Sequence, residues 1–350
     1  MGQVHTEKQN GCDEQRLAEA VPGTQFFASP LERALKVDSF VGTTISGRAI
    51  YGAVLGVCSP YRSVITGLAK RIVLVRFLAP KNAPPFIRER LSAAQISANE
   101  KTRTFQALGY DVALSLLPWS QPARLRQVIN DANSDRHTTA IIVQMPIPDG
   151  LTDVLDLIDP EKDIDGLRGR LSQYPSCATA EGIMRVLKAV APKRTIAVVG
   201  ARGFVGHDVY DLLVRDGRAV MPLDRDDDLL QVRDADLIVS AVGMPSLLTS
   251  AHLHPRHLVV IDAGFTWTAM GVRGDVALSA TAIPKHITPV PGGVGPIEMA
   301  ILMERAIRHD VNSNLPSWEL SPKVLMAPDS IELTLPVESL LNEELVRPDA

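Results

Sequence analysis

The sequence predicts an α/β fold made of two successive domains, each built around a parallel sheet. The first observation is a set of short apolar runs, such as Arg71–Leu78 (RIVLVRFL), which have the length and composition of buried strands. The second is that these runs alternate with helical patterns, which favours a parallel sheet covered on both faces. The third is that the same alternation starts again after Gly182.

The composition is that of an ordinary globular chain: 350 residues, of which 45% are hydrophobic and 22% charged. A formal net charge of −4, without Lys/Arg runs interleaved with aromatics, argues against nucleic acid as a partner. No run of about 18 apolar residues occurs and the first residues are polar, so we expect no membrane span, no signal peptide and a cytoplasmic location. Cys12, Cys58 and Cys177 lack the spacing of a disulfide framework or a zinc site.

The first domain is expected over residues 41–180, after a polar extension at 1–40. Its predicted elements are a strand at 71–78, a helix at 91–108, a strand at 110–117, a helix at 125–132 and a strand at 140–144.

The second domain is expected over residues 181–298. Its predicted elements are a helix at 183–190, a strand at 195–199, a helix at 209–215, and strands at 219–223, 237–242 and 258–263. Residues 299–350 are expected to pack back onto the first domain. Five prolines interrupt the part after residue 311, for which the alternative is a partly mobile tail.

A glycine-rich turn follows the strand at 195–199. It contains Gly200, Ala201, Arg202, Gly203 and Gly206, and a helix comes after it. Such a turn lets a pyrophosphate lie on backbone N–H groups at the positive end of the helix. The glycine spacing of three and three differs from the standard two and three, so the turn alone could be merely structural. Its place between a strand and a helix predicts a Rossmann-like, doubly wound dinucleotide-binding domain.

The acidic residue expected beside the adenosine ribose is Asp224, 24 positions after Gly200. A carboxylate there favours NAD, because it would repel the 2′-phosphate of NADP. Arg202 and Arg225 argue for NADP, since guanidinium groups bind phosphates well. The sequence favours NAD, and NADP stays open.

Lys101 lies on the apolar stripe of the helix at 91–108, between Ala98 and Phe105. Burial of an ammonium group without a partner lowers its pKa, which makes a lysine usable in acid/base chemistry near neutral pH. The alternative is that only the methylene stem packs while the amine reaches solvent.

Two polar positions could accompany Lys101. Gln144 ends the strand at 140–144, and the carboxyl ends of parallel strands line the ligand crevice. Asp163 and Asp165 lie in the segment PEKDIDGL, where ionised Asp165 would suit a ring that presents adjacent N–H donors. Both aspartates could instead be turn or helix-cap residues.

Residues 287–296 read ITPVPGGVGP, which predicts a shaped loop rather than a helix or strand. A helix is expected from Ile297, so the loop would present free N–H groups at a helix N-terminus. We expect a binding surface, with a simple chain-reversing turn as the alternative.

The histidines at 252, 254 and 257 form a cluster in sequence. A metal site would need a further ligand and supporting hydrogen bonds, so we predict no metal.

Taken together, these segments resemble the bifunctional methylenetetrahydrofolate dehydrogenase/methenyltetrahydrofolate cyclohydrolase family. The resemblance runs from about Ser46 to Arg308. It is carried by VQMPIP (143–148), PEKDIDGL (160–167), the VVG turn ending at Val205-Gly206, ADLIVSAVG (235–243), VVIDAG (259–264) and ITPVPGGVGP. It implies a folate-type catalytic domain joined to a nicotinamide-dinucleotide domain, with the folate in the cleft between them.

The resemblance also implies roles for individual residues. Lys101 corresponds to the family's catalytic lysine, Gln144 to the glutamine that tunes it and Asp165 to the aspartate that holds the pterin ring. The dinucleotide would accept hydride from 5,10-methylenetetrahydrofolate, and the lysine would assist water attack that gives 10-formyltetrahydrofolate. The implied substrate-binding residues are Ser97, Pro291, Gly292 and Gly293, and the cofactor would contact Gly243 and Gly295 besides the glycine turn, Asp224 and Arg225.

Several positions depart from the family's pattern. Ser97 replaces a tyrosine, which removes a stacking face worth about 0.5–1.5 kcal/mol beyond area burial. Glu298 replaces a threonine after the Pro-Gly loop, and Arg202 and Arg225 replace serines near the cofactor. Residues 80–89 look like an insertion near the substrate entrance.

The expected function is oxidation of 5,10-methylenetetrahydrofolate to 5,10-methenyltetrahydrofolate with NAD or NADP, with or without hydrolysis to 10-formyltetrahydrofolate. One alternative is an enzyme of a specialised pathway that acts on a modified folate or another one-carbon carrier. The other is a non-catalytic folate- or dinucleotide-binding paralogue. The resemblance also implies a homodimer.

Overall fold

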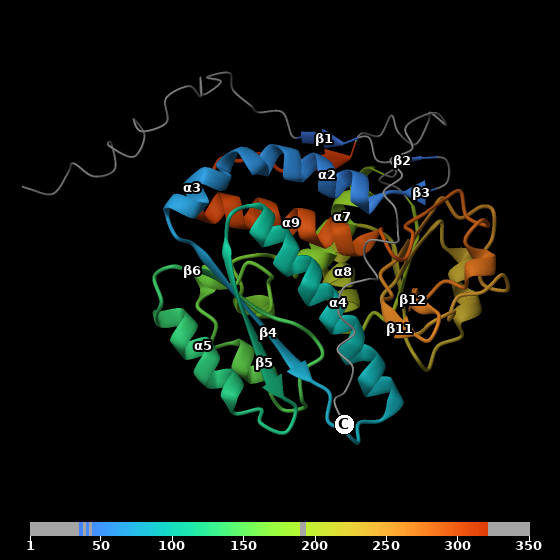
Figure 1. Ribbon diagram of the computed structural model, residues 1–350. Helices are drawn as coiled ribbons and strands as arrows, with labels where there is room; N and C mark the ends of the chain where they lie inside the picture. The colour runs from blue at the N-terminus through green and yellow to red at the C-terminus, as the bar shows by residue number, and fades with distance from the viewer. Residues whose placement is uncertain (1–34, 38–39, 42–43, 190–193, 321–350) are drawn as a thin grey trace, which may run out of the picture. The chain divides into compact units, whose positions relative to one another are not determined.

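Figure 1 shows the computed structural model of the chain, which describes residues 35–37, 40–41, 44–189 and 194–320. Most of the predicted extension at 1–40, and the tail after residue 320, lie outside the described residues. The parts that are described at these two ends pair with each other. Strand β1 (Leu35–Val37) lies parallel to β14 (Trp318–Leu320), where the sequence analysis predicted no strands.

A parallel three-stranded sheet has the order β5-β4-β6. Its strands are β4 (Arg71–Leu78), β5 (Asp111–Pro118) and β6 (Thr138–Val143). Side chains alternate between its faces, as a strand requires. Ile72 and Leu74 pack in one core cluster with residues of α4 (Pro85–Ala107), whereas Val73 and Val75 pack in another with residues of α5 (Arg124–Ser134). The later part of α4, with Ala98 and Phe105, therefore covers one face and α5 the other, while Leu91 near the start of α4 packs in the second cluster.

Helix α4 begins earlier than predicted. The apolar stripe predicted a start at residue 91, but the helix starts at Pro85, inside the stretch predicted to be an insertion. Proline is well suited to the first turn of a helix, because its missing N–H has no intrahelical partner there. The early start adds almost two turns of helix before the stripe.

The larger sheet has seven strands in the order β2-β3-β13-β10-β9-β7-β8. The strands are β2 (Phe40–Val41), β3 (Thr44–Ile45), β7 (Ile196–Val199), β8 (Val220–Leu223), β9 (Leu237–Ser240), β10 (Val259–Asp262) and β13 (His286–Ile287). All neighbours are parallel except β2 and β3. The chain order reverses between β7 and β9, which is where open α/β sheets bind ligands.

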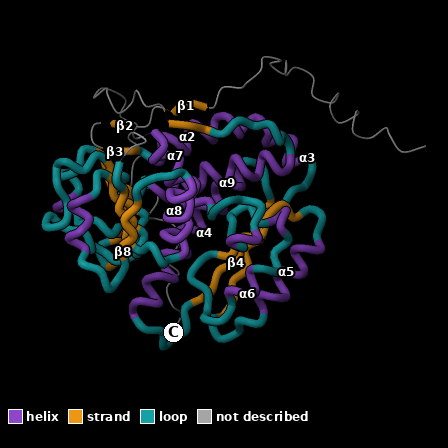
Figure 2. Tube along the Cα trace, turned by 180° about the vertical axis from the view of Figure 1, so that it is seen from behind, coloured by secondary structure: helices purple, strands orange, loops and turns teal. Residues whose placement is uncertain are grey.

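The two faces of this sheet are covered differently. Helices α7 (Ala178–Ala189) and α8 (Phe204–Arg215), seen from behind in Figure 2, share a core with Ile196 and Val198 of β7. The opposite face, with Ala197 and Val199, packs on the 3-10 helix η4 (Leu229–Asp234) and nearby loops. We had expected helices on both faces, and one face instead has short 3-10 turns and loops.

Helix α9 (Val294–Asp310) packs against α4, α7 and α2 (Gly47–Cys58), and Figure 1 shows it running beside α2. The prediction of a pure loop at 287–296 was wrong at both ends. Ile287 belongs to β13, and the helix starts at Val294 instead of 297. A proline at 296 is tolerated because it lies in the first helical turn.

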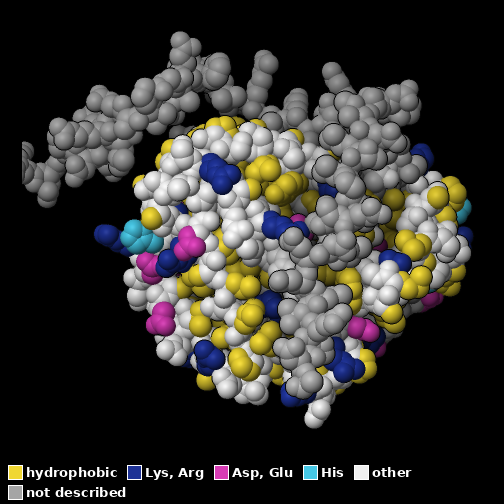
Figure 3. Space-filling view, viewed as in Figure 1, with side chains coloured by type: hydrophobic (Ala, Val, Ile, Leu, Met, Phe, Trp, Pro, Cys, Tyr) yellow, Lys and Arg dark blue, Asp and Glu magenta, His cyan; other side chains and the backbone are white. Residues whose placement is uncertain are grey.

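The remaining elements are short. They are η1 (Ser59–Tyr61), α3 (Arg62–Gly67), α6 (Thr152–Leu155), η2 (Pro160–Lys162), η3 (Gly169–Leu171), β11 (Thr266–Thr268), β12 (Gly271–Arg273) and η5 (Leu278–Ala280). Among the helices described, none has the length and apolarity to cross a bilayer. On the surface visible in Figure 3, basic side chains are scattered rather than gathered into one patch.

The N-terminus of α2 touches the Pro-Gly loop so closely that only glycine fits. A Cβ on Gly47 would lie 1.8 Å from the carbonyl oxygen of Gly293, whereas a Cβ on Gly52 of the same helix would meet nothing within 4 Å. We predict that Gly47→Ala lowers the free energy of unfolding by about 1–3 kcal/mol, as overpacking does. Gly52→Ala should leave it unchanged or raise it by about 0.5–1 kcal/mol. Denaturant unfolding of both variants checks this, and equal effects would contradict the close contact.

Candidate active site

The side chain of Lys101 lies at the centre of a buried polar cluster. Only 2% of it is exposed, and its Nζ donates hydrogen bonds to Gln144 Oε1 (3.0 Å) and Glu298 Oε1 (2.5 Å). Asp165 Oδ2 lies 4.0 Å from the same nitrogen. The prediction that Lys101 faces the core is confirmed, and the alternative in which the amine reaches solvent is wrong. The structure also brings together the three residues predicted to be catalytic.

The expected effect of burial on Lys101 was wrong in its sign. Burial by itself lowers the pKa of an ammonium group, but the carboxylates of Glu298 and Asp165 outweigh it, so the pKa of Lys101 is raised. The difference comes from the two acidic partners, which the argument from burial alone did not include. Lys101 is therefore held as a cation at neutral pH.

Glu298 is a member of the Lys101 cluster to which sequence reasoning gave no role. It was noted only as a departure from the family's pattern. The first turns of α9 carry it toward Lys101, and Thr179 at the start of α7 also hydrogen-bonds its carboxylate. The available signal was an acidic residue directly after the Pro-Gly loop, but only the fold shows that it faces the lysine.

Ser97 belongs to the same cluster. It lies one helical turn before Lys101, and its Oγ donates to Gln144 Oε1 (3.2 Å) while accepting from Lys101 Nζ (3.4 Å). The Gln144 oxygen thus accepts two hydrogen bonds, which fixes the orientation of its amide. The residue that replaces an aromatic face here adds a polar contact instead.

Asp163 and Asp165 have different roles, which their sequence positions could not separate. The Asp163 carboxylate accepts hydrogen bonds from the backbone N–H groups of Leu167 (2.7 Å) and Arg168 (3.2 Å), so it shapes the loop. For Asp163 the turn interpretation is therefore right. Asp165 points to Lys101 instead.

Arg305 of α9 fixes the backbone next to Asp165. Its guanidinium donates to the carbonyl oxygens of Ile164 (2.7 Å) and Ser176 (3.1 Å) and lies over the ring of Tyr174 at 3.9 Å. A salt bridge to Glu181 neutralises the buried charge. The position of Asp165 thus depends on a residue far away in sequence.

The glycine turn lies at the carboxyl end of β7. Gly200 has a φ of +85°, a region that favours glycine. A Cβ on Gly206 would lie 2.0 Å from the Gly200 carbonyl oxygen, so the helix packs closely on the turn. Arg202 and Gly203 are exposed, and no side chain caps the first N–H groups of α8. These groups are free to bind an anion.

Asp224 follows β8, as predicted, but its carboxylate also holds the turn in place. One oxygen accepts from the backbone N–H of Arg202 (2.8 Å) and the other from that of Arg225 (2.9 Å). These backbone hydrogen bonds lower the pKa of Asp224. The side chain of Arg202 lies 4.0 Å from Asp226, and the side chains of Arg202 and Arg225 are exposed.

A second loop meets the glycine turn at the point where the strand order reverses. It follows β9 and contains Gly243, with a φ of +73°. Buried Asp275 shapes it by accepting from Ser240 Oγ (2.7 Å), Val242 N (2.9 Å) and Met244 N (2.7 Å). Sequence reasoning gave Asp275 no role, because its partners are more than 30 residues away. The turn, this loop and the exposed helix N-terminus together fit a dinucleotide.

The Pro-Gly loop connects β13 of the seven-stranded sheet to α9 and also contacts α2. Gly292 has a φ of +107°, and its carbonyl oxygen accepts from the backbone N–H of Arg48 in α2 (3.2 Å). Gly293 and Gly295 flank the start of α9, which leads to Glu298 and so to Lys101. The roles predicted for Pro291, Gly292, Gly293 and Gly295 in binding stay predictions.

The histidine cluster binds backbone groups. His252 Nδ1 accepts from the N–H of Thr249, and His257 Nδ1 accepts from that of His254, each at 3.1 Å. Burial lowers the pKa of His257 to about 4. Within the described part of the chain, no three His, Cys, Asp or Glu residues are grouped as a metal site.

Comparison with known proteins agrees with this geometry. Residues 86–165 match the catalytic-domain model of tetrahydrofolate dehydrogenase/cyclohydrolase, and residues 177–313 match the model of its NAD(P)-binding domain. The chain is 34% identical over 252 residues to the bifunctional protein FolD of Lacticaseibacillus paracasei, covering 66% of this chain and 88% of that protein. It is 33% identical to the protein of the same name from Parafrankia sp., covering 71% and 96%.

The chain belongs to the tetrahydrofolate dehydrogenase/cyclohydrolase family. A crystal structure of the FolD enzyme from Campylobacter jejuni superposes with a TM-score of 0.66 and 25% identity, over 77% of this chain and 99% of that one. The Trypanosoma brucei enzyme, complexed with NADP and an inhibitor, gives a TM-score of 0.63 at 24% identity over 78% and 98%, which supports the fold.

The effect of the buried acid Glu298 on the charge of Lys101 can be tested. We predict that Glu298→Gln lowers the pKa of Lys101, because removal of a negative charge destabilises the ammonium form. The neutral amine should therefore appear at lower pH than in the unmodified protein. Glu100→Gln is the matched control, because it changes an exposed acid in α4, the helix of Lys101. It should leave the pKa of Lys101 unchanged.

The measurement is a pH titration of lysine side-chain signals by heteronuclear NMR, with Lys101→Met used for assignment. An identical Lys101 titration in the Glu298→Gln and Glu100→Gln variants would show that Glu298 does not control the charge of the lysine.

Proposed function

We propose that this member of the tetrahydrofolate dehydrogenase/cyclohydrolase family oxidises 5,10-methylenetetrahydrofolate to 5,10-methenyltetrahydrofolate with a nicotinamide dinucleotide. The family places the chain in folate one-carbon metabolism. The observation that carries the proposal is the buried group formed by Lys101, Gln144 and Asp165, on a chain that also has a complete dinucleotide turn. The alternative of a non-catalytic folate- or dinucleotide-binding paralogue predicts binding without turnover.

In this proposal the residues of the cluster bind and orient the folate. The Asp165 carboxylate accepts hydrogen bonds from adjacent N–H donors of the pterin ring. The Lys101 ammonium would donate to the folate beside its one-carbon unit by giving up the long hydrogen bond to Ser97 (3.4 Å), while Gln144 holds the ammonium in place. The bound dinucleotide would supply the chemistry of hydride acceptance. The backbone of residues 200–206 and the loop with Gly243 would hold it.

We expect hydrolysis of the methenyl product to be slower than its formation. Assistance to water attack requires a group that accepts a proton, and Lys101 is held as a cation by two carboxylates. Glu298 would have to share this work, because its carboxylate is the nearest acceptor to Lys101 Nζ. Hydride transfer needs no proton acceptor at the lysine, so the ion pair does not oppose it.

The residues expected beside the adenosine ribose, Asp224, Arg202 and Arg225, favour NAD as the cofactor. Asp224 is fixed there as an anion, and Asp226 lies within 4.0 Å of Arg202, which reduces the positive charge available for a 2′-phosphate. Arg225 is the remaining cation. The contribution of each exposed pair is small, on the order of 1 kcal/mol or less, so the preference is expected to be modest.

We further propose a homodimer in the cytoplasm. Strand β8 is one edge of the seven-stranded sheet, and Pro222 in it lacks an N–H donor, so we expect a partner to pack against this edge through side chains rather than by strand pairing. Light scattering should give twice the mass of the chain. A monomer at micromolar concentration would contradict this proposal without affecting the chemistry.

The function is tested by following methenyl formation spectrophotometrically from 5,10-methylenetetrahydrofolate, with NAD and NADP in parallel. We predict turnover, with the higher kcat/KM for NAD. Lys101→Met should reduce kcat by about 100-fold or more, as loss of a positioned polar catalytic group does. Lys285→Met, a change of an exposed lysine, is the control. Dinucleotide binding without turnover would overturn the proposal.

A further inference from the structure

A second buried cation lies next to the Lys101 cluster. Arg76 is in β4 and continues the face that carries Ile72 and Leu74, which is the face covered by α4. The parallel register pairs Val75 with Val143, and the N–H of Gln144 donates to the Val75 carbonyl oxygen at 2.8 Å. Arg76 and Gln144 are therefore cross-strand neighbours on one face of the sheet.

Arg76 is buried, and among the described residues no acidic side chain pairs with its charge. Only 8% of it is exposed, and its Nε has no hydrogen-bond partner within the described part of the chain. Burial lowers the pKa of its guanidinium, but arginine stays charged in proteins. Burying an unpaired charge is costly, so a chain that keeps one there has reason to bind an anion. Lys101, by comparison, has both Glu298 and Asp165.

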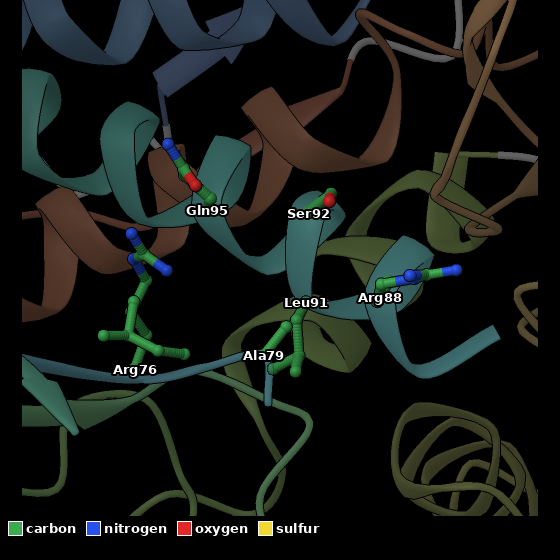
Figure 4. Close-up of a pocket in the computed structure, with 7 residues that line it drawn as sticks. Arg76, Ala79, Arg88, Leu91, Ser92 and Gln95 are labelled. Atoms are coloured by element: carbon green, nitrogen blue, oxygen red, sulfur yellow. The ribbon is translucent and has the colours of Figure 1, made fainter. Parts of the chain in front are cut away.

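A cavity of about 200 Å³ lies beside Arg76. Among the described residues, its lining contains two cations, two neutral polar side chains and no acid: Arg76, Leu78, Ala79, Arg88, Leu91, Ser92 and Gln95. In Figure 4 the Arg76 guanidinium extends from β4 toward Gln95 on α4, whereas Arg88 extends away from it. Arg76 is thus the inner cation of the cavity, and exposed Arg88 belongs to its rim.

The distance from Lys101 to the cavity is fixed, because α4 carries both Lys101 and two of the lining residues. Gln95 and Ser92 precede Lys101 in α4 by six and nine residues, which is about 9 and 14 Å along a helix axis. In a folate, the p-aminobenzoyl group spans a comparable length between the one-carbon unit and the glutamate carboxylates. A folate with its one-carbon unit at Lys101 and its tail along α4 would bring a carboxylate to this cavity.

We propose that Arg76, with Gln95 and Ser92, forms a carboxylate-binding site for the glutamate tail of the folate substrate. The proposal rests on the proposed function, because it takes the folate to react at Lys101. The planar guanidinium can donate two parallel hydrogen bonds to one carboxylate, and the burial of Arg76 strengthens them. The early start of α4 at Pro85 supplies the helical turn that closes the cavity with Arg88 and Leu91.

The test compares Arg76→Gln with Arg90→Gln, which removes an exposed arginine of α4 that does not line the cavity. For 5,10-methylenetetrahydrofolate, Arg76→Gln should raise KM about tenfold or more and change kcat less than twofold. A substrate whose glutamate carboxylates are amidated should show the raised KM already in the unmodified enzyme, with no further increase in the variant. Arg90→Gln should match the unmodified enzyme with both substrates.

A structural role would give another pattern. Thermal unfolding of Arg76→Met should show an unchanged or higher midpoint, because the variant removes an unpaired buried charge. A lower midpoint, together with equal KM increases for the normal and the amidated substrates, would overturn the proposal and leave the proposed function intact.

Calorimetric binding measurements, which need no turnover, test the carboxylate site independently of the proposed function. Calorimetry with p-aminobenzoyl-L-glutamate, free glutamate and p-aminobenzamide should show binding of the first only, weakened about tenfold or more by Arg76→Gln. Equal binding of free glutamate would assign the site to any small carboxylate and overturn the folate-tail proposal. Arg76-dependent binding of the first compound by an enzyme without folate turnover would support the site while the proposed function failed.

Discussion

The ion pair between Lys101 and Glu298 is the interaction on which the site depends, because it connects α4 to the first turns of α9. Helix α9 then fixes two further parts of the molecule. Arg305, two turns later, holds the backbone beside Asp165. Asp310, at the end of the helix, accepts from Tyr110 (2.9 Å) and Thr139 (2.7 Å) at the three-stranded sheet. Helix α9 therefore fixes the positions of Lys101, Asp165 and the three-stranded sheet relative to one another.

This arrangement explains why the charge of the lysine and its position cannot be separated. The carboxylate that raises the pKa of Lys101 is also the group that fixes the direction of its ammonium. An enzyme that needs a lysine as proton acceptor gains from a weaker partner, whereas one that needs a fixed cation gains from a stronger one. Glu298 is a strong partner, which is consistent with a site organised for oriented hydride transfer rather than for water activation.

The sequence predicted the features that are encoded locally. The strand at 71–78 was correct to the residue, and the buried face of Lys101 followed from helical spacing. Features that depend on contacts between distant segments could not be predicted. The pairing of Lys101 with Glu298 joins residues 197 positions apart, and the role of Asp275 depends on three partners at the end of β9 and in the loop after it. The starts of α4 and α9 were placed too late, because prolines in a first turn look like helix breakers in sequence.

Lys101 of α4 and Arg76 of β4 are two buried cations between the helix and the three-stranded sheet. They differ in whether the chain itself supplies an acidic partner. Lys101 has carboxylates of the chain itself, so its charge is balanced before any ligand binds. Among the described residues, Arg76 has no such partner, and the cavity that it lines has no acidic side chain. Because the Lys101 charge is already compensated by carboxylates of the chain, the uncompensated charge of Arg76 gains more from an anionic ligand. Substrate binding near Gln144 would thus be strengthened mainly through Arg76, while Lys101 keeps the orientation that the chain has already given it.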